Sequence, residues 1–312
     1  MLRQVLLYLS NQPRAAAFVR RNGVAKRFAE RFVAGDTLEQ ALDVVATLNA
    51  KRITASLDLL GESVHSDAEA RAAGREYLHV LDRIHERGLD ANVSVKLTAM
   101  GLDISEDLCV ANVLDVLARA RDYRTFVRLD MESSAYTERT LRLFHERFLP
   151  AYPAHVGIVL QSYLYRTEAD VARAIEARVR VRLCKGAYKE PPAVAFPSKS
   201  DVDANYLQCM RRLLREGTYP GIATHDERLL REAKAFVASE RIDATRFEFQ
   251  MLYGVRRDLQ MALVAQGYRV RVYVPFGTQW YPYLMRRLAE RPANVFFIAG
   301  SVLREAARRH SA

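Results

Sequence analysis

Eight short runs of apolar and β-branched residues recur along the chain after residue 50. Runs of this length and composition are typical of buried β-strands. They span residues 53–60, 92–101, 125–132, 155–163, 178–188, 220–226, 246–252 and 268–277. The first 50 residues have helical periodicity instead, without the turn residues that usually separate strands. The pattern therefore predicts an N-terminal helical extension over residues 1–50 and an eight-stranded domain over residues 51–312.

Amphipathic segments lie between consecutive runs, at residues 67–88, 170–177, 203–217, 226–240 and 254–267. Several begin at an Asp and end near a Gly, as helix caps prefer. Strands that alternate with helices form parallel βαβ units, and eight such units close into a barrel. We therefore expect an α/β fold of the (βα)8 TIM-barrel type. An open doubly wound sheet shares the alternation, but the chain has neither Gly-x-Gly-x-x-Gly after its first strand nor a Walker A loop.

The segment "WYPYLMRRLAERPAN" (280–294) predicts one more amphipathic helix, which ends before Pro292. Its apolar side carries Tyr281, Leu284, Met285 and Leu288, and its polar side carries Tyr283, Arg286, Arg287 and Glu290. Considered locally, the polar side is a solvated face with Arg–Glu pairs worth about 0.2–0.5 kcal/mol each. The alternative is that the two adjacent arginines bind an anion.

The composition is that of a soluble globular protein, with 312 residues, 50% hydrophobic and 27% charged. The net charge of +10 favours acidic partners, but no block of five or six like charges is present, so we expect no nucleic-acid partner. No apolar segment is long enough for a membrane span, which favours a cytoplasmic protein whose basic N-terminal region touches a membrane surface. The three cysteines have no metal or redox spacing and are interpreted as reduced core thiols.

The active site of a (βα)8 barrel lies at the C-terminal ends of its strands. Polar residues at the predicted ends are Asp58, Lys96, Asp130, Glu132, Gln161, Arg182, Lys185, Thr224, His225, Asp226, Gln250 and Tyr273. Singly, each has a structural explanation, such as pairing of Asp130 with Arg128. Together they are mainly cationic or hydrogen-bonding, which predicts an anionic ligand or a large polar cofactor. One histidine with scattered acids is a poor metal site, and no Ser-His-Asp arrangement is evident.

Seven motifs carry a resemblance to a known family. They are "SVKLTAMG", "RLDMES", "VLQSY", "VRLCKGAY", "ATHD", "FQMLYG" and "YVPFGTQWYPYLMRRLAERPAN", in this order over residues 92–294, about two thirds of the chain. The set resembles proline dehydrogenase, a flavoenzyme, in its short monofunctional bacterial form. The resemblance implies a distorted barrel whose last helix caps the C-terminal ends of the strands. Arg286 and Arg287 would there bind the proline carboxylate with Lys96 as a third cation, because the planar guanidinium matches a carboxylate.

The same resemblance implies roles for further residues. Glu290 would hold an arginine of the last helix in position, Tyr273 and Tyr283 would enclose the pyrrolidine ring, and Leu252 would cover it. Asp130 and Arg182 would be the catalytic polar residues. FAD would lie along the strand ends against Met131, Gln161, Arg182, Lys185, Gly186, Ala187, Thr224, His225 and Gln250, with Lys199 facing its adenosine part. In "CKGAY", a Gly followed by Ala also suits close approach of a flat group to the main chain.

The resemblance implies FAD-dependent oxidation of L-proline to 1-pyrroline-5-carboxylate, the first step of proline degradation. Hydride would pass from proline C5 to flavin N5, and the electrons would go on to a membrane quinone through peripheral contact with the inner face of the cell membrane. A separate 1-pyrroline-5-carboxylate dehydrogenase would consume the product, because 312 residues leave no room for that second domain. Two alternatives stay open: a Schiff-base aldolase that uses Lys96 or Lys185, and a basic module that binds nucleic acid or membrane.

Overall fold

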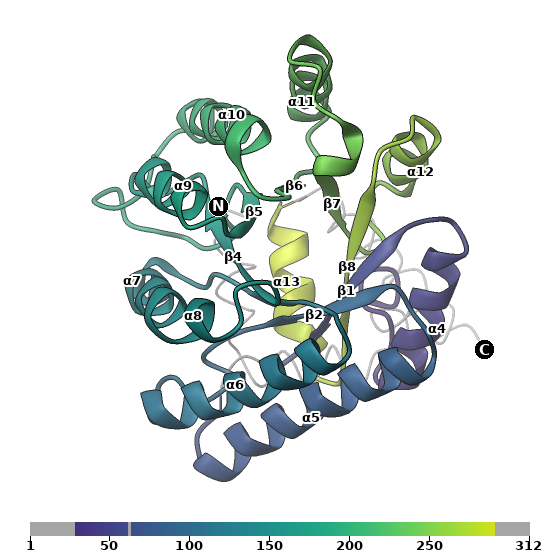
Figure 1. Cartoon of the computed structure of the whole chain (residues 1–312), viewed down its shortest axis with the longest axis vertical. Coiled ribbons are helices and arrows are strands. Elements are labelled where there is room, and N and C mark those ends of the chain that lie inside the picture. Colours follow the sequence, from purple (N-terminus) through teal and green to yellow (C-terminus); the bar gives the residue numbers. More distant parts are fainter. Residues whose placement is uncertain (1–28, 62–63, 291–312) are drawn as a thin grey trace, which may run out of the picture.

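Eight parallel strands close into a barrel in the order in which they occur in the sequence (Figure 1). The computed structural model describes residues 29–61 and 64–290. Each predicted run overlaps one strand: β1 (Thr54–Leu59), β2 (Ala91–Val95), β3 (Val127–Leu129), β4 (Val156–Gln161), β5 (Arg180–Cys184), β6 (Gly221–Ala223), β7 (Glu248–Leu252) and β8 (Val270–Phe276). β1 pairs with both β2 and β8, which closes the sheet. The predicted (βα)8 barrel is therefore confirmed.

Several strands are shorter than the runs that predicted them. The run at 92–101 leaves the sheet after Val95, and residues 97–104 form turns. There the Thr98 N–H bonds the Glu132 carboxylate at 3.2 Å instead of a neighbouring strand. The run at 178–188 ends as a strand at Cys184, and Gly186 then has a φ of +113°. Apolar composition continues past β2 because residues 97–102 are also buried, whereas residues 185–188 after β5 are only half-buried.

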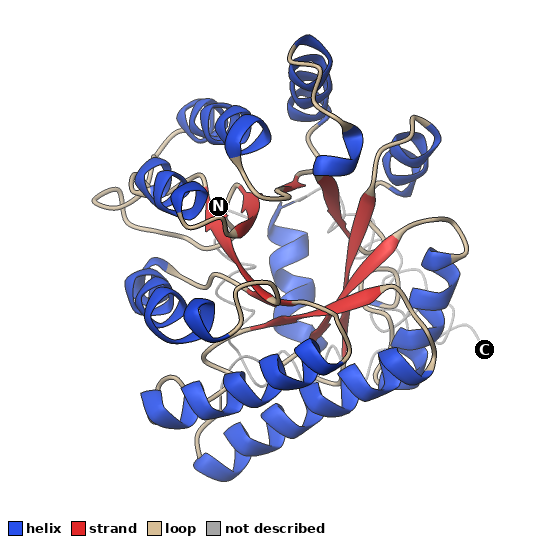
Figure 2. Ribbon diagram, viewed as in Figure 1, coloured by secondary structure: helices blue, strands red, loops and turns tan. Residues whose placement is uncertain are grey.

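Helices surround the barrel on its outside (Figure 2). They are α4 (Leu38–Asn49), α5 (Asp67–Glu86), α6 (Glu106–Asp122), α7 (Ser134–Leu143), α8 (Leu149–Ala151), α9 (Thr167–Glu176), α10 (Lys199–Glu216), α11 (Glu227–Ser239) and α12 (Arg257–Ala265). A π-helical turn, η1 (Phe144–Phe148), joins α7 to α8, and a 3-10 turn, η2 (Ala244–Arg246), precedes β7. α4 packs against β1 and β8, and its Leu42 and Val45 are fully buried in the core shared with the strands. The domain boundary at residue 50 stays a prediction.

The helix ends follow the predicted capping chemistry in part. The Asp226 carboxylate caps α11 by accepting the Arg228 N–H at 3.0 Å, and Gly88 and Gly267 follow α5 and α12 with positive φ. The predicted start of α10 at residue 203 is wrong, since that helix begins at Lys199 with Ser198 as its cap. Asp203 lies one turn inside the helix because its carboxylate is buried against cations.

α13 (Trp280–Glu290) follows β8 and lies across the middle of the helical ring, which confirms the predicted capping helix (Figure 1). Tyr281 and Leu284 are 1% and 2% exposed and pack in a cluster with Phe32 and Leu60. Tyr283, on the opposite side, is also buried, at 5% exposure. The local interpretation as a solvated face is therefore wrong for Tyr283, and its burial agrees with the alternative in which this side of the helix faces the protein. The side chains of Arg286 and Glu290 lie outside the described residues.

Candidate active site

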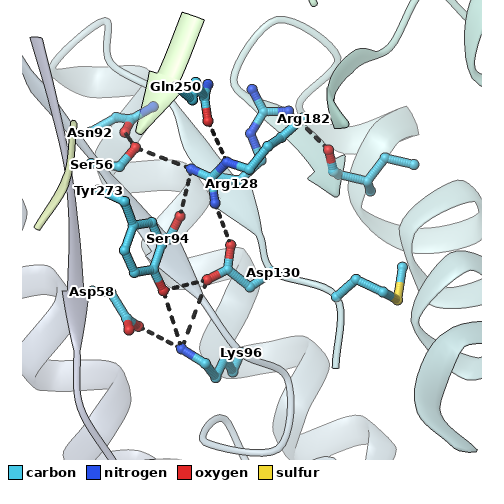
Figure 3. Close-up of polar contacts among 12 residues, drawn as sticks. Ser56, Asp58, Asn92, Ser94, Lys96, Arg128, Asp130, Arg182, Gln250 and Tyr273 are labelled. Carbon is cyan, nitrogen blue, oxygen red and sulfur yellow. Dashed lines mark hydrogen bonds and ion pairs between the residues drawn. The ribbon is translucent and has the colours of Figure 1, made fainter. Parts of the chain in front are cut away.

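Polar side chains line the inside of the barrel at alternate strand positions (Figure 3). Successive residues of a strand point to opposite faces, so every second residue of a barrel strand points inward. Ser56 and Asp58 occupy such positions on β1, and Ser94 does so on β2, two residues before Lys96, which follows that strand. All four residues are less than 10% exposed. The barrel interior is therefore a polar, buried environment in which charged groups need partners.

The Asp130 carboxylate is the centre of the polar network. Its Oδ1 accepts a hydrogen bond from Arg182 Nη1 at 2.7 Å, and its Oδ2 accepts one from Tyr273 Oη at 2.7 Å. Lys96 Nζ lies 3.8 Å from the same Oδ2. Lys96 and Asp130 directly follow β2 and β3, as predicted. Arg182 and Tyr273, predicted at strand ends, lie instead in the middle of β5 and β8, and barrel closure brings all four to one place. The structure thus joins four residues that the sequence analysis selected separately.

Asp58 is the ion-pair partner of Lys96. Its Oδ1 accepts a hydrogen bond from Lys96 Nζ at 2.8 Å, and Lys96 Nζ also lies 3.4 Å from Tyr273 Oη. Asp58 is only 1% exposed, and this burial raises the pKa of its carboxyl, against the opposing effect of Lys96. Two buried carboxylates therefore balance two buried cations, which buried charges require.

Arg182 is held on every edge of its guanidinium. Nε donates to the amide oxygen of Gln250, and Nη2 lies 3.4 Å from Ser56 Oγ and 3.2 Å from Ser94 Oγ. The guanidinium carbon also lies 5.2 Å from the centre of the Tyr273 ring. A cation fixed in this way is preorganised to stabilise negative charge at the strand ends.

A second charged cluster connects the end of β5 with α10 and α11. Lys185 Nζ forms ion pairs with Asp203 at 2.6 Å and with Asp226 at 2.9 Å, and Lys199 Nζ lies 2.6 Å from Asp203. Arg228 adds a third cation to Asp203 at 2.7 Å. Burial alone would raise the pKa of Asp203, but Lys185 and Lys199 outweigh it and lower that pKa to about 2. Lys185 and Lys199, predicted as cofactor-binding residues, thus share one carboxylate.

The side-chain amide of Gln161, the last residue of β4, has hydrogen-bond partners for its nitrogen but none for its oxygen within the described residues. Its Nε2 donates to the carbonyls of Met131 and Glu132 at 3.4 and 3.3 Å. Its Oε1 is buried and has no hydrogen-bond partner within the described residues. A buried acceptor of this kind needs a donor, because leaving it unpaired costs about 1–3 kcal/mol. A ligand N–H at the strand ends would satisfy it.

The other predicted cofactor residues lie in the loops after β5 and β6. His225 Nε2 accepts the Leu252 N–H at 2.9 Å, which ties that loop to the end of β7. Thr224 Oγ1 accepts the Asp226 N–H at 3.1 Å. Gly186 leaves no room for a side chain, because a Cβ there would lie 2.5 Å from the Tyr163 ring, and the half-buried Ala187 follows it. These predicted cofactor-binding residues therefore lie together, next to the C-terminal ends of β5 and β6.

FAD fits this set of residues by the chemistry of its groups. The unpartnered Gln161 oxygen suits the ring N–H of a flavin, and Arg182 suits its electron-accepting side. The cations at Lys185 and Lys199 suit the anionic diphosphate. Within the described part of the chain, no group of three or more His, Cys, Asp or Glu residues could hold a metal ion. None of the helices that the structure describes combines the length and apolarity that a bilayer-spanning segment needs.

Two of the predicted substrate-binding residues of α13, Tyr283 and Arg287, have side chains that the structure describes. The Arg287 guanidinium carbon lies 5.2 Å from the centre of the Tyr283 ring. This is a cation–π arrangement, which helps to hold the guanidinium in place. Arg287 is half-buried. The predicted roles of Arg286 and Glu290 concern side chains outside the description, so they stay predictions.

Sequence reasoning missed several residues of the network. Ser56, Ser94 and Glu248 lie inside predicted strands, and Glu190 lies in the loop after β5. Glu190 accepts the Ser134 N–H at 2.8 Å and the Tyr163 hydroxyl at 3.1 Å. The period-two alternation of polar and apolar residues inside each strand was a signal for the first three. No local pattern marks Glu190.

The comparisons with known proteins show the family to which the chain is similar. The family model described as proline dehydrogenase matches residues 41–299. Proline dehydrogenase 1 of Bacillus subtilis subsp. natto is 41% identical over 305 residues, covering 98% of this chain and 100% of the relative. Proline dehydrogenase of Deinococcus radiodurans is 40% identical and covers 97% of this chain and 98% of its own.

Among solved structures, the chain is similar to the crystal structure of proline utilization A from Bdellovibrio bacteriovorus inactivated by N-propargylglycine. The TM-score is 0.78 at 28% identity, over 85% of this chain and 32% of that one. The fold and its buried polar interior define a (βα)8-barrel protein with a candidate active site at its strand ends. The chain belongs to the proline dehydrogenase family. The resemblance that the motifs predicted is confirmed, including the short form, since the chain matches these short relatives over nearly their full length.

Proposed function

We propose that the chain oxidises L-proline to 1-pyrroline-5-carboxylate, the first step of proline degradation. Bound FAD would supply the acceptor, with hydride passing from proline C5 to flavin N5. The observation that supports the proposal best is the Asp130 network with Arg182, Tyr273 and Lys96 at the strand ends of a member of the proline dehydrogenase family. The residues that would hold FAD are Met131, Gln161, Arg182, Lys185, Gly186, Ala187, Lys199, Thr224, His225 and Gln250.

Arg286 and Arg287 bind the proline carboxylate in this proposal, and Lys96 adds a third positive charge. Two guanidinium groups can bind both carboxylate oxygens, which fixes the orientation of the ring. Tyr273 and Tyr283 enclose the pyrrolidine ring, and Leu252 covers it, so that water is excluded. Glu290 holds one of the arginines in its rotamer.

The proline nitrogen must be neutral for hydride to leave C5, because its lone pair forms the new C=N bond. The described cations Lys96 and Arg182 are balanced by Asp58 and Asp130. The arginines of α13 add two positive charges beyond that balance, and Glu290 and the proline carboxylate together offset them. The charges are then balanced without a charge on the proline nitrogen, so the neutral amine is favoured over the ammonium form.

Arg182 and Asp130 divide the catalytic work between them. Arg182 holds a positive charge where negative charge develops as hydride arrives. Asp130 keeps that guanidinium and the Tyr273 hydroxyl in place through its two oxygens. Asp130 acts in this account as an orienting carboxylate and not as a strong base.

The electrons pass to a membrane quinone, which requires peripheral contact with the membrane. We place the enzyme in the cytoplasm, at the inner face of the cell membrane, where a net charge of +10 favours anionic lipid. The product passes to a separate 1-pyrroline-5-carboxylate dehydrogenase. No nucleic acid takes part.

Contacts of the two lysines weigh against the Schiff-base aldolase. A lysine that attacks a carbonyl must be neutral, and apolar burial or a neighbouring cation normally favours that form. Lys96 instead pairs with Asp58 at 2.8 Å, and Lys185 pairs with Asp203 and Asp226. Both lysines are thus engaged in ion pairs with carboxylates, which is not the environment that activates a lysine as a nucleophile.

Proline labelled with deuterium at C5 tests the reaction and its position together. The proposal predicts slower reduction of the bound flavin than with unlabelled proline, and a product that keeps one of the two labels. Proline labelled at C2 is the matched control and should react at the unlabelled rate with its label retained. A rate effect and label loss with the C2-labelled substrate would instead mean oxidation at the α-carbon, and would contradict the proposal.

A further inference from the structure

A buried hydrogen-bonded chain lies directly behind Arg182, on its side away from Asp130. Arg182 Nε donates to Gln250 Oε1, and Gln250 Nε2 donates to Glu248 Oε1 at 2.5 Å. Glu248 Oε1 also accepts from Arg271 Nε at 2.8 Å. Gln250 and Glu248 are inward residues of β7, two positions apart, and are 4% and 3% exposed. The contact between Arg182 and Gln250 can be seen in Figure 3.

Glu248 decides which way the Gln250 amide faces. An amide has a donor end and an acceptor end, whereas an ionised carboxylate only accepts. Burial alone would raise the pKa of Glu248, but Arg271 outweighs it and the pKa is lowered, so the carboxylate is ionised. Gln250 must therefore turn its NH₂ group to Glu248 and its oxygen to Arg182. With the amide reversed, the NH₂ group would face the Nε–H of Arg182, donor against donor.

Gly221 provides the space that this arrangement needs. A Cβ at Gly221 would lie 2.4 Å from Gln250 Nε2 and 2.8 Å from its Cδ. Gly221 pairs with Glu248 in the register of β6 and β7. The space left by the missing side chain therefore lies next to the Arg182–Gln250–Glu248 hydrogen bonds. Any side chain there would displace the amide. Glycine at this position is thus explained by close approach of Gln250, because its φ is not in the left-handed region.

We propose that Glu248 is a positioning residue for the reaction, which acts through Gln250 on the guanidinium of Arg182. The inference rests on the proposed function, since Arg182 is the residue that would stabilise the accepting flavin. Glu248 is the first residue of β7, at the opposite end of the strand from the proposed site, so it would touch neither substrate nor cofactor. Asp130, Ser56 and Ser94 hold the two Nη groups of Arg182. Glu248, through Gln250, holds the remaining Nε edge and prevents the guanidinium from rotating.

A purely structural role is the competing explanation, because Glu248 also neutralises the buried Arg271. The swapped variant Glu248→Gln with Gln250→Glu separates the two. In the swap, the carboxylate at position 250 accepts from Arg182, and the amide at position 248 donates to it. Arg271 still loses its carboxylate at position 248. The swap therefore restores the acceptor for Arg182 but not the Arg271 pair.

The experiment measures kcat and KM for proline, the reduction potential of the bound flavin by chemical titration, and the unfolding temperature. Glu248→Gln should lower kcat about tenfold or more and lower the potential, with KM for proline within about twofold of wild type. The swapped variant should have a kcat within about threefold of wild type. Its reduction potential should be close to the wild-type value. Gln250→Met leaves the Glu248–Arg271 pair intact and should lower kcat and the potential as Glu248→Gln does.

Asp82→Asn is the control, because Asp82 is a part-buried carboxylate that binds Arg119 and Tyr123 outside the barrel interior. It should lower the unfolding temperature without moving the potential. A wild-type kcat and potential in Gln250→Met, or a swapped variant as impaired as Glu248→Gln, would overturn the inference. Failure of proline to reduce the wild-type flavin would contradict the proposed function instead, and the chemically titrated potentials would still test the positioning role.

Discussion

The hydroxyl of Tyr273 and the guanidinium of Arg182 bind the two oxygens of one carboxylate, that of Asp130, each at 2.7 Å. The guanidinium carbon also lies 5.2 Å from the centre of the Tyr273 ring. A residue proposed to enclose the substrate is thus coupled to the residue proposed to stabilise the cofactor. Changes at Tyr273 should therefore separate into effects of its ring and effects of its hydroxyl.

The ring of Tyr273 should set the substrate preference. We predict that Tyr273→Ser raises kcat/KM for 4-hydroxyproline relative to proline about tenfold or more, because it removes the wall beside the pyrrolidine ring. Tyr273→Phe is the matched control: it keeps the ring, loses the bond to Asp130 and should leave this ratio near its wild-type value. Steady-state kinetics with both substrates give the answer. If the ratio stays unchanged in Tyr273→Ser, the ring does not guard that side of the substrate.

The paired arginines of α13 should act on substrate binding alone. Arg286→Ala or Arg287→Ala should raise KM for proline about 10- to 100-fold, the effect expected for loss of a charge-assisted hydrogen bond. FAD should remain bound, as judged by the flavin absorbance that co-purifies with the protein. Arg231→Ala, which removes an exposed arginine of α11, should leave KM unchanged. Wild-type proline kinetics in both α13 variants would remove the carboxylate-binding assignment.

Gly186 should matter for cofactor binding through lack of space. Its φ is +113°, and a Cβ would lie 2.5 Å from the Tyr163 ring, so Gly186→Ala forces the loop after β5 to move. We expect FAD affinity to fall about tenfold or more. Gly267→Ala is a close control, since Gly267 also has a positive φ, of +85°, but nothing within 4 Å of the added Cβ.

The control variant should lose about 1–2 kcal/mol of stability through backbone strain and keep its FAD affinity. Titration of the apoprotein with FAD, followed by flavin fluorescence, measures both variants. Equal FAD affinities in the two would show that the space at Gly186 is not needed for the cofactor.

Asp203 should make the stability depend on pH in the acid range. Its pKa is lowered from 3.8 to about 2 by Lys185 and Lys199, which outweigh burial. A lowered pKa in the folded state stabilises the protein above the unfolded value, and this stabilisation is lost as the pH falls from about 4 towards 2. Asp203→Asn should therefore be less stable than wild type at pH 7, and the difference should shrink on acidification.

Urea midpoints at neutral and acid pH measure this difference. Asp115→Asn, which removes an exposed carboxylate of α6, should stay close to wild type at each pH. A difference between Asp203→Asn and wild type that is as large in acid as at pH 7 would mean that the charge of Asp203 is not what stabilises this cluster.

The barrel could be predicted because each strand carries its own apolar run and each helix its own periodicity. The lengths of the strands could not be predicted, because buried loops such as residues 97–104 are as apolar as the strands that they follow. The start of α10 was misplaced because Asp203 looks like a cap and is instead a buried partner of Lys185. Local patterns report burial and capping, but not which of two buried roles a polar residue has.

The strand ends could be predicted as the place of the site, and Lys96, Asp130, Arg182 and Tyr273 do meet there. The sequence did not reveal that Asp58 would neutralise Lys96, because the two are 38 positions apart and only barrel closure joins them. Partners of this kind are set by register between strands, which no single run encodes. The alternation within β7 marks Glu248 as an inward residue, but its pairing with Arg271 of β8 depends on register in the same way.

The most direct measurement of the central claim is a visible spectrum of the purified protein before and after addition of proline under anaerobic conditions. The account predicts a yellow protein with a flavin band at about 450 nm that bleaches when proline is added. An L-amino acid without the pyrrolidine ring, such as valine, should leave the band unchanged. A colourless protein that cannot be reconstituted with FAD, or a flavin band that proline does not bleach, would contradict the account.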